Sequence, residues 1–164
     1  MNEFNELDEM YREIILDHYR SPRNNQPIVK PTKEIESNNP FCGDEIKLQL
    51  NIEDGIVTEI GVLGRGCAIS QASASLMGEA LLEKNINDSL ELYSSFRELL
   101  TGNLPEDQLD NLGDLLALEG VKKFPIRVKC ALLSWSAFND LIDDESLKIK
   151  YRDDFTDLKG DRKS

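Results

Sequence analysis

The chain of 164 residues is 40% hydrophobic and 30% charged, and its 31 acidic residues outnumber its 19 basic residues, giving a net charge of −12. Length and composition predict one globular domain, residues 1–164, whose core is large enough to fold without disulfide bonds. The acidic charge argues against nucleic acid or an anionic membrane as the main partner, because both are bound through clustered Lys and Arg. A basic protein surface is a better match for it.

The three cysteines cannot all pair with one another, which argues against an extracellular disulfide framework. The first residues, Met1 to Glu6, are acidic and polar rather than basic and then apolar, so they do not resemble a signal peptide. No apolar run approaches the length needed to cross a membrane. We therefore expect a cytoplasmic protein whose thiols stay reduced.

Residues 7–20 carry apolar side chains at helical spacing and predict a helix within an N-terminal segment, residues 1–23. Asn5 is the expected N-cap, and Ser21-Pro22 is expected to end the helix. The single histidine, His18, lies near the end of this helix. The simplest interpretation is a surface or helix-end histidine favoured by the helix dipole, and a metal or catalytic role is the alternative.

A small antiparallel sheet is predicted next. Residues 24–31 form an irregular arm rich in Pro and Asn, and residues 33–38 are a short edge strand. Residues 45–53 alternate between apolar and polar side chains, as a half-buried strand does. Asp54-Gly55 predicts a tight hairpin that leads into a return strand over residues 56–63.

The rest of the chain is predicted to be mainly helical. A helix over about 68–84 begins with small residues, and a capping box at 88–91 begins a second helix that runs to about residue 100. Residues of about 101–119 form an acidic, leucine-rich insert of short helices. Pro125 introduces a last helix over 126–142, and the charged tail, about 143–164, is expected to lie loosely on the surface.

The run Asn39-Pro40-Phe41-Cys42-Gly43-Asp44 places a thiol and a carboxylate two positions apart. Residues i and i+2 of a strand face the same side, and Gly43 permits a tighter turn, so Cys42 and Asp44 can face one point. Cys67 follows two glycines at the expected start of a helix, where unpaired N–H groups and the helix dipole favour a thiolate. Cys130 lies in the first two turns of the last helix.

Taken singly, each cysteine is equally well explained as a small buried hydrophobic residue. Together, three thiolates and one carboxylate are enough for a closed four-coordinate metal site. The spacing is not that of a zinc finger or zinc ribbon, because no pair of Cys-x-x-Cys motifs is present. The spacing alone therefore leaves both interpretations open.

Three segments together resemble the SufU proteins, the zinc-dependent sulfurtransferase branch of the iron–sulfur scaffold family that also contains IscU and the N-terminal part of NifU. They are Pro40 to Asp44, Gly64 to Ser73 and Phe124 to Leu133, and the helical run Ile15 to Asn24 is also similar. The resemblance covers nearly the whole chain up to about Trp135. It implies an α+β fold with helices packed on one side of a small antiparallel sheet and a metal site at one exposed end.

The resemblance also implies functional residues. Zinc would be held by Cys42, Asp44, Cys67 and Cys130. Cys42 would accept persulfide sulfur from a SufS-like cysteine desulfurase that depends on pyridoxal phosphate, for delivery to downstream iron–sulfur scaffold proteins. The expected activity is that of a sulfurtransferase, and whether the chain alone counts as an enzyme is left open.

Two departures from the IscU pattern bear on this function. Lys129 stands where IscU-type scaffolds have a histidine before the third cysteine, and the insert at about 101–119 is a feature of SufU proteins. Because a lysine amine is normally protonated, it cannot be expected to bind iron as an imidazole does, so sulfur transfer is favoured. Arg127 and Lys129 would moderate the negative charge of the site, guide a partner, or simply be solvated.

Three other functions are considered. The first is an iron–sulfur scaffold that binds iron or a [2Fe-2S] cluster on the same ligands. The second is an interaction module with a structural zinc and no transfer chemistry. A thiol hydrolase that pairs a cysteine with His18 is the least favoured, because nothing in the sequence supplies an obvious oxyanion hole or a residue that orients the histidine.

Overall fold

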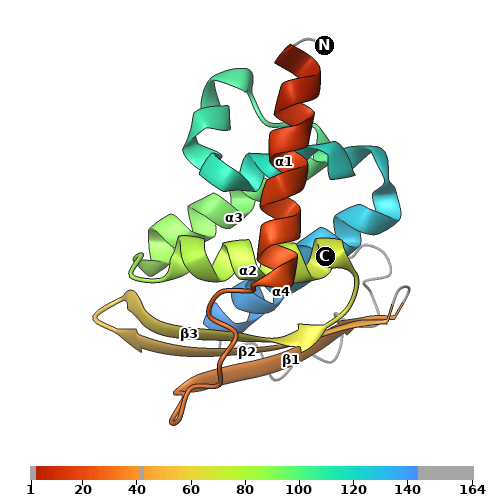
Figure 1. Cartoon of the computed structure of the whole chain (residues 1–164). Helices are drawn as coiled ribbons and strands as arrows, with labels where there is room; N and C mark the ends of the chain where they lie inside the picture. The colour runs from red at the N-terminus through yellow and green to blue at the C-terminus, as the bar shows by residue number, and fades with distance from the viewer. Residues whose placement is uncertain (1–2, 41–42, 144–164) are drawn as a thin grey trace.

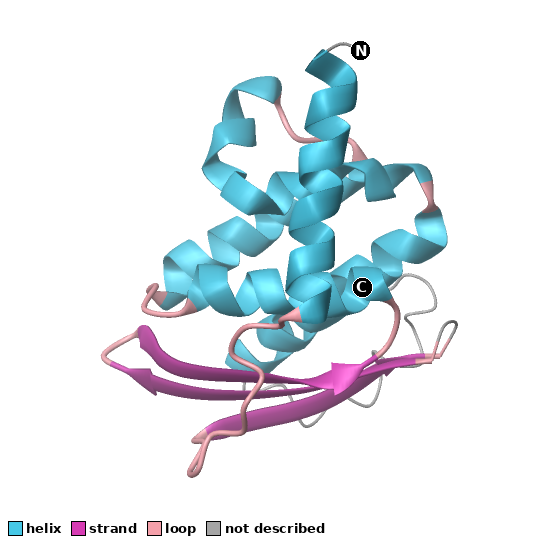
Figure 2. Cartoon of the chain, viewed as in Figure 1, coloured by secondary structure: helices cyan, strands magenta, loops and turns pink. Residues whose placement is uncertain are grey.

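Three antiparallel strands form one sheet, and the described helices lie over one of its faces (Figure 1, Figure 2). The structure is a computed structural model that describes residues 3–40 and 43–143. The predicted α+β architecture, with helices on one side of a small antiparallel sheet, is confirmed.

The sheet consists of β1 (Lys33–Asn39), β2 (Asp44–Glu53) and β3 (Ile56–Arg65), in that order. The alternation in β2 has the predicted effect, because Leu48 and Leu50 are fully buried while Glu53 is exposed. Asp54 and Gly55 both have positive φ angles, 53° and 77°, as a tight hairpin turn requires. The structure extends the predicted strands by one or two residues, so that β2 begins at Asp44 itself.

The arm over residues 24–31 is irregular, as predicted, and it covers part of the β3 edge. The backbone N–H of Val62 donates to the carbonyl oxygen of Asn24 over 2.8 Å. The N–H of Ile28 donates to the Gln49 side chain over 2.8 Å. A methyl group at Gly61 would lie 2.7 Å from the Gln26 carbonyl oxygen, so the close approach of the arm requires a glycine there. The arm thereby pairs backbone groups at the edge of the sheet.

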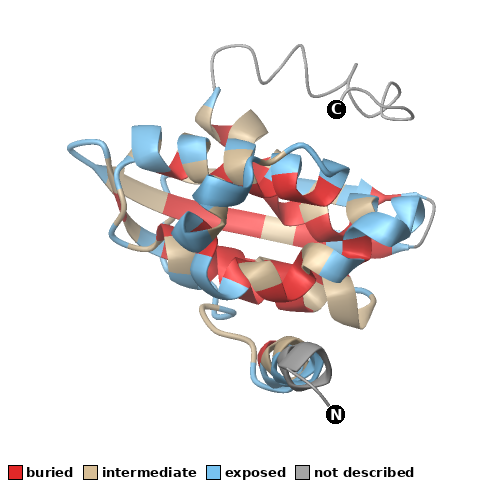
Figure 3. Ribbon diagram, turned by 90° about the horizontal axis from the view of Figure 1, so that it is seen from above, coloured by how far each residue is buried: buried red, intermediate tan, exposed pale blue. Residues whose placement is uncertain are grey.

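The helices form two layers above the sheet. Helices α2 (Ala68–Leu81) and α4 (Pro125–Ile142) pack directly on the strands, α2 on β3 and α4 on β1 and β2. Helix α1 (Glu3–Arg20) packs on α2, and α3 (Ile86–Thr101) packs on η1 (Glu106–Lys123) in the outer layer. Figure 3, seen from above, shows buried residues along the middle of the sheet and on the helices that cover it. The small side chains of α2 permit its close approach to both neighbouring layers.

Trp135 lies at the centre of the core and is fully buried. Its indole N–H donates to Ser73 Oγ over 3.2 Å, and the Ser73 hydroxyl donates to the Ala131 carbonyl oxygen over 2.6 Å. The Phe96 ring lies 5.0 Å from the Trp135 ring, centroid to centroid. This network connects α2, α3 and α4, and it gives the buried indole nitrogen the partner that it needs.

Three predicted helix boundaries are wrong. Helix α1 begins at Glu3, so Asn5 lies within it and is not its N-cap. Helix α3 begins at Ile86, and its N-cap is Asn85, whose side-chain oxygen accepts from the Asp88 N–H over 2.7 Å. The predicted capping box therefore lies one turn inside the helix.

Helix α2 ends at Leu81 rather than at about residue 84. Glu83 has a φ of 68°, and its N–H donates to the carbonyl oxygen of Val57 over 2.7 Å. The N–H of Val57 in turn donates to the carbonyl oxygen of Lys84 over 3.0 Å. Pairing with the start of β3 thus satisfies the backbone groups of these residues in place of a further helical turn.

The acidic insert consists of short helices, as predicted. Segment η1 is of the 3₁₀ type and is kinked at Gly113, which has a φ of 56°. Leu112, Leu115 and Leu118 are buried in the core, and most of the acidic side chains face outward. Of the predicted tail, only Asp143 lies within the described residues. Among the described helices, none has both the length and the low polarity that a membrane-crossing segment requires.

Candidate metal centre

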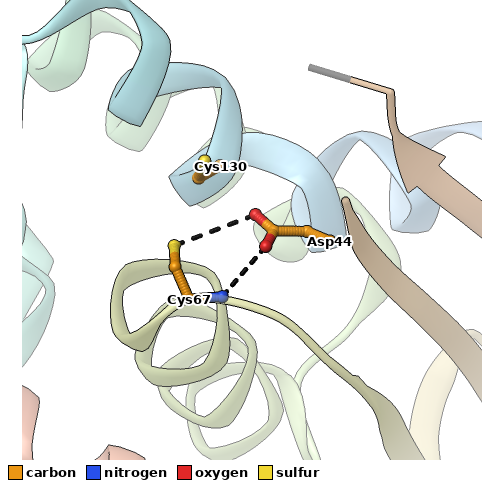
Figure 4. A group of neighbouring side chains, drawn as sticks. All are labelled: Asp44, Cys67 and Cys130. Carbon is orange, nitrogen blue, oxygen red and sulfur yellow. Dashed lines mark hydrogen bonds between the residues drawn. The ribbon is translucent and has the colours of Figure 1, made fainter. Parts of the chain in front are cut away.

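Chain segments that are far apart in sequence converge at one end of the sheet. Strand β1 ends at Asn39, which lies opposite Asp44 at the start of β2. Strand β3 ends at Arg65, just before Cys67, and Cys130 approaches from α4. Figure 4 shows the side chains of Asp44, Cys67 and Cys130 gathered from three different elements.

The ligand atoms of Asp44, Cys67 and Cys130 all lie within 4.8 Å of one another. Cys67 Sγ is 3.8 Å from Asp44 Oδ2, and the Cys67 backbone N–H donates to Asp44 Oδ1 over 2.9 Å. Two sulfur ligands of one tetrahedral zinc ion are separated by about 3.8 Å, since each Zn–S bond is about 2.3 Å long. Small side-chain movements would therefore bring these three groups onto one metal ion.

Cys67 is the N-cap of α2, at the helix start where the sequence predicted it. Its sulfur accepts a hydrogen bond from the Ser70 N–H over 3.4 Å. The preceding glycine is required for space, because a methyl group at Gly66 would overlap the Asp44 carboxylate and lie 2.7 Å from Ser70 Oγ. The sequence Gly66-Cys67 therefore permits the start of the helix to lie directly against the carboxylate.

Gln71 holds the loop before α2 in place. With its side-chain oxygen facing the loop, Gln71 accepts hydrogen bonds from the backbone N–H groups of Arg65 (3.1 Å) and Gly66 (2.8 Å). No sequence pattern points to this contribution of Gln71.

Asp44 is fully buried and Cys130 is 2% exposed, whereas Cys67 is half-buried. A buried carboxylate is costly unless it is hydrogen-bonded and its charge is compensated. The Cys67 N–H at the positive end of α2 provides part of that compensation. A divalent cation between the carboxylate and the two sulfurs would provide more, and this mixed donor set is one that zinc accepts.

Cys42, the fourth predicted ligand, lies outside the described residues, so its role stays a prediction. Arg127 and Lys129 lie on the surface of the first two turns of α4, close in sequence to Cys130. Both residues are therefore exposed near the start of the helix that carries Cys130. That they moderate the negative charge of the site stays a prediction.

His18 lies in the last turn of α1, as predicted, but it is buried, with 3% of its surface exposed, so its interpretation as a surface residue is wrong. The Arg23 backbone N–H donates to Ser75 Oγ over 2.9 Å, and His18 Nδ1 lies 2.7 Å from the same oxygen. The direction of the hydrogen bond between Ser75 and Nδ1 depends on the imidazole tautomer. The other ring nitrogen, Nε2, lies 3.6 Å from Glu79 Oε1.

This arrangement gives His18 a structural role. Ser75 lies two turns along α2 from Cys67, which is about 12 Å along the helix axis. His18 is not part of the group formed by Asp44, Cys67 and Cys130. Its contacts join α1 to α2, and the contact with Ser75 spans too many residues for sequence periodicity to reveal it.

The chain is similar to known proteins over most of its length, including Asp44, Cys67 and Cys130. Residues 10–131 match the family described as the NifU-like N terminal domain. The zinc-dependent sulfurtransferase SufU of Bacillus subtilis (strain 168) is 44% identical over 131 residues, which cover 80% of this chain and 88% of that protein. The iron–sulfur cluster assembly scaffold protein IscU of Streptococcus pyogenes serotype M1 is 34% identical, with 83% of this chain and 84% of that protein covered.

A solved structure has the same fold. FiSufU from Fervidobacterium islandicum AW-1, described as an iron–sulfur cluster assembly scaffold protein for the SUF system, superposes with a TM-score of 0.73. It is 31% identical, and the match covers 77% of this chain and 92% of that one. The sequence resemblance to the SufU branch is thereby confirmed. The chain belongs to the family of NifU-like N-terminal domains.

Proposed function

We propose that this protein is a zinc-dependent sulfur acceptor in iron–sulfur cluster assembly, which takes persulfide sulfur from a cysteine desulfurase onto Cys42. The observation that supports the proposal most directly is the convergence of the Asp44, Cys67 and Cys130 ligand atoms within 4.8 Å. Cys42 is separated from Asp44 by Gly43 alone, so covalent geometry keeps their Cα atoms within about 7 Å of each other. A fourth ligand from Cys42 would complete a tetrahedral site.

Zinc, when bound, would keep the cysteine sulfurs deprotonated and would tolerate the exchange of one ligand, because it has no ligand-field preference for geometry. Three of the four proposed ligands are held by described elements. Asp44 and Cys130 are buried within β2 and α4, and Cys67 is the N-cap of α2. Because these three are fixed in place, we infer that Cys42 is the ligand that is exchanged.

In the proposed transfer, the Cys42 thiolate attacks the terminal sulfur of a persulfide on the desulfurase. A new S–S bond forms on Cys42, and the S–S bond of the donor breaks. The donor cysteine leaves as a thiolate, and the terminal sulfur keeps its proton, so no external oxidant or reductant is needed. A thiolate is required for the attack, and a cysteine released from a metal ion begins in that form.

The relatives support sulfur transfer over cluster assembly on this chain. Identity is 44% to the zinc-dependent sulfurtransferase of Bacillus subtilis and 34% to the IscU scaffold of Streptococcus pyogenes. Lys129 adds to this, because the lysine that precedes Cys130 in the sequence does not provide the imidazole ligand that a histidine there would. Neither Cys67 nor Cys130 forms a disulfide bond within the described residues, so a reducing compartment such as the cytoplasm is the expected setting.

A second candidate function is that of an iron–sulfur scaffold, which the similarity to IscU proteins favours. The same residues would then hold iron or a [2Fe-2S] cluster. Anaerobic reconstitution with iron and sulfide separates the two functions. A stable coloured cluster that passes to an apo-ferredoxin would favour the scaffold, and tightly retained zinc with no such cluster would favour the sulfur acceptor.

Turnover of the cognate cysteine desulfurase tests the proposal. We expect the wild-type protein to accelerate release of alanine from cysteine, because it removes the persulfide from the desulfurase. Cys42→Ala and Cys42→Ser are expected to abolish this acceleration, since neither side chain can carry the sulfur. If Cys42→Ala accelerates turnover as well as the wild type does, the assignment of Cys42 as acceptor is wrong. An interaction module with a structural zinc would produce no persulfide on any residue.

A further inference from the structure

Asn39, at the end of β1, is a buried polar residue beside the candidate metal centre. Only 5% of its surface is exposed, and it lies opposite Asp44 in the ladder between β1 and β2. Its side-chain Nδ2 donates to Cys130 Sγ over 3.9 Å, a separation within the range of hydrogen bonds to sulfur. One amide therefore connects the end of the first strand to the cysteine of α4.

The backbone of Asn39 holds the adjoining turn. Its carbonyl oxygen accepts the N–H of Gly43 over 2.9 Å. Gly43 has a φ of 74°, a conformation that glycine adopts without strain. Asn39 thus contacts Cys130 through its side chain and Gly43, the residue before Asp44, through its backbone.

An N–H group that donates to a metal-bound thiolate affects both the electrons on the sulfur and the position of the ligand. It stabilises the negative charge on the sulfur, and it withdraws electron density, so the sulfur is a weaker nucleophile towards a persulfide. It also fixes the orientation of the ligand, as other outer-shell hydrogen bonds do. Cys67 accepts a comparable bond from the Ser70 backbone, which a side-chain substitution does not remove.

We propose that Asn39 is a positioning residue that keeps Cys130 on the metal. This inference rests on the proposed function, because it assumes a zinc ion shared by these cysteines. Asn39 would act through Cys130 and would not touch the transferred sulfur. Loss of its amide should therefore loosen the metal even when no desulfurase is present.

The release of zinc from the purified, zinc-loaded protein to a chromogenic chelator tests this role. Asn39→Ala is compared with wild type and with Asn38→Ala, a matched control because Asn38 is the preceding residue of the same strand and is exposed. We expect Asn39→Ala to release zinc at least about tenfold faster than wild type, the lower end of the effect of losing an outer-shell partner. Asn38→Ala should release zinc at the wild-type rate.

A second variant guards against a general loss of structure. Asn39→Asp has nearly the same shape but replaces the donor with a carboxylate that only accepts hydrogen bonds. It should also release zinc faster than wild type, with a circular dichroism spectrum like that of wild type. In the cobalt-substituted protein, the thiolate-to-cobalt absorption bands should shift in both Asn39 variants and stay in place in Asn38→Ala.

The outcomes separate this inference from the proposed function. If the wild type retains zinc, and both Asn39 variants release it no faster than Asn38→Ala does and leave the cobalt bands unshifted, the proposed role of Asn39 is wrong. The proposed metal centre would be unaffected by that result. A wild-type protein that retains no zinc would overturn the proposed metal centre and the role of Asn39 with it. Faster release from both Asn39 variants supports the inference whatever the desulfurase assay shows.

Discussion

The backbone N–H of Cys67 donates to Asp44 Oδ1 over 2.9 Å, so the residue that caps α2 holds the carboxylate that begins β2. The cysteine sulfur lies 3.8 Å from the other carboxylate oxygen. This pair connects the end of the hairpin to the start of a helix and orients both side chains towards Cys130. The candidate metal centre is built around this pair of residues, so substitutions that crowd or remove either partner should disturb it.

Gly66→Ala should disrupt the centre. The added methyl group would overlap the Asp44 carboxylate and crowd Ser70 Oγ. We expect the zinc-free protein to lose about 1–3 kcal/mol of unfolding free energy, as overpacking typically costs. Urea denaturation measures this. Gly120→Ala is the control, because a methyl group there would meet no atom within 4 Å, and equal effects of the two substitutions would contradict the crowding at Gly66.

Asp44→Ala should weaken zinc binding. The substitution removes a proposed ligand and leaves the Cys67 N–H without its carboxylate partner. We expect zinc affinity to fall by more than about tenfold, since losing even an outer-shell partner costs that much. A competition titration against a chelator gives the affinity. Glu45→Ala is the control, because it removes the next carboxylate in the strand, which is exposed. An equal loss of zinc affinity in the two variants would argue against a specific role for Asp44.

His18 should make stability depend on pH. Burial lowers the pKa of His18, as does the Arg23 guanidinium, while Glu79, Asp17 and Asp114 oppose that shift. Because the folded-state pKa lies below the unfolded value, the unfolded chain binds the proton first as the pH falls. The contribution of neutral His18 is complete above an unfolded pKa of about 6.5 and is lost as the pH falls from there towards the folded-state pKa.

Denaturation curves at several pH values between about 7 and 5.5 measure this effect, because His is the only side chain whose ordinary pKa lies in that window. The protein has a single histidine. The free energy of unfolding of the wild type should therefore fall over this range more steeply than that of His18→Gln. Parallel curves for the two proteins would contradict the neutral, buried state of His18.

Ser73→Ala should destabilise the core. The hydroxyl of Ser73 accepts from the Trp135 indole and donates to the Ala131 carbonyl, and Ser73 is fully buried. Its removal leaves a buried indole N–H without its partner, which costs about 1–3 kcal/mol. The fluorescence of Trp135, the only tryptophan, reports unfolding in urea. Ser94→Ala, at an exposed position of α3, should stay within about 0.5 kcal/mol of wild type.

Most of the fold was predictable from local patterns. The alternation over residues 45–53 and the Asp54-Gly55 turn predict the hairpin that is observed. The wrong boundaries lie where another contact replaced the local preference. Asn85, one turn before the predicted box, caps α3 by accepting from the Asp88 N–H, and pairing of Glu83 and Lys84 with Val57 ends α2 early.

The positions of Cys67 and Cys130 at the starts of α2 and α4 were predictable, and the residues that support them were not. Gly66-Cys67 indicates a thiol at a helix start, and the structure places it there. The contact between Asn39 and Cys130 joins residues 91 positions apart, and that between His18 and Ser75 joins residues 57 positions apart. No periodic pattern connects residues at such separations, so these contacts depend on how the helices pack on the sheet.

Mapping of the transferred sulfur tests the proposed function most directly. The zinc-loaded protein is incubated with the desulfurase and cysteine, desalted, alkylated and analysed by peptide mass spectrometry. We predict that the peptide containing Cys42 gains the mass of one sulfur atom, while those containing Cys67 and Cys130 stay unmodified. A persulfide on Cys67 or Cys130 with none on Cys42, or no persulfide on any of the three, would contradict the account.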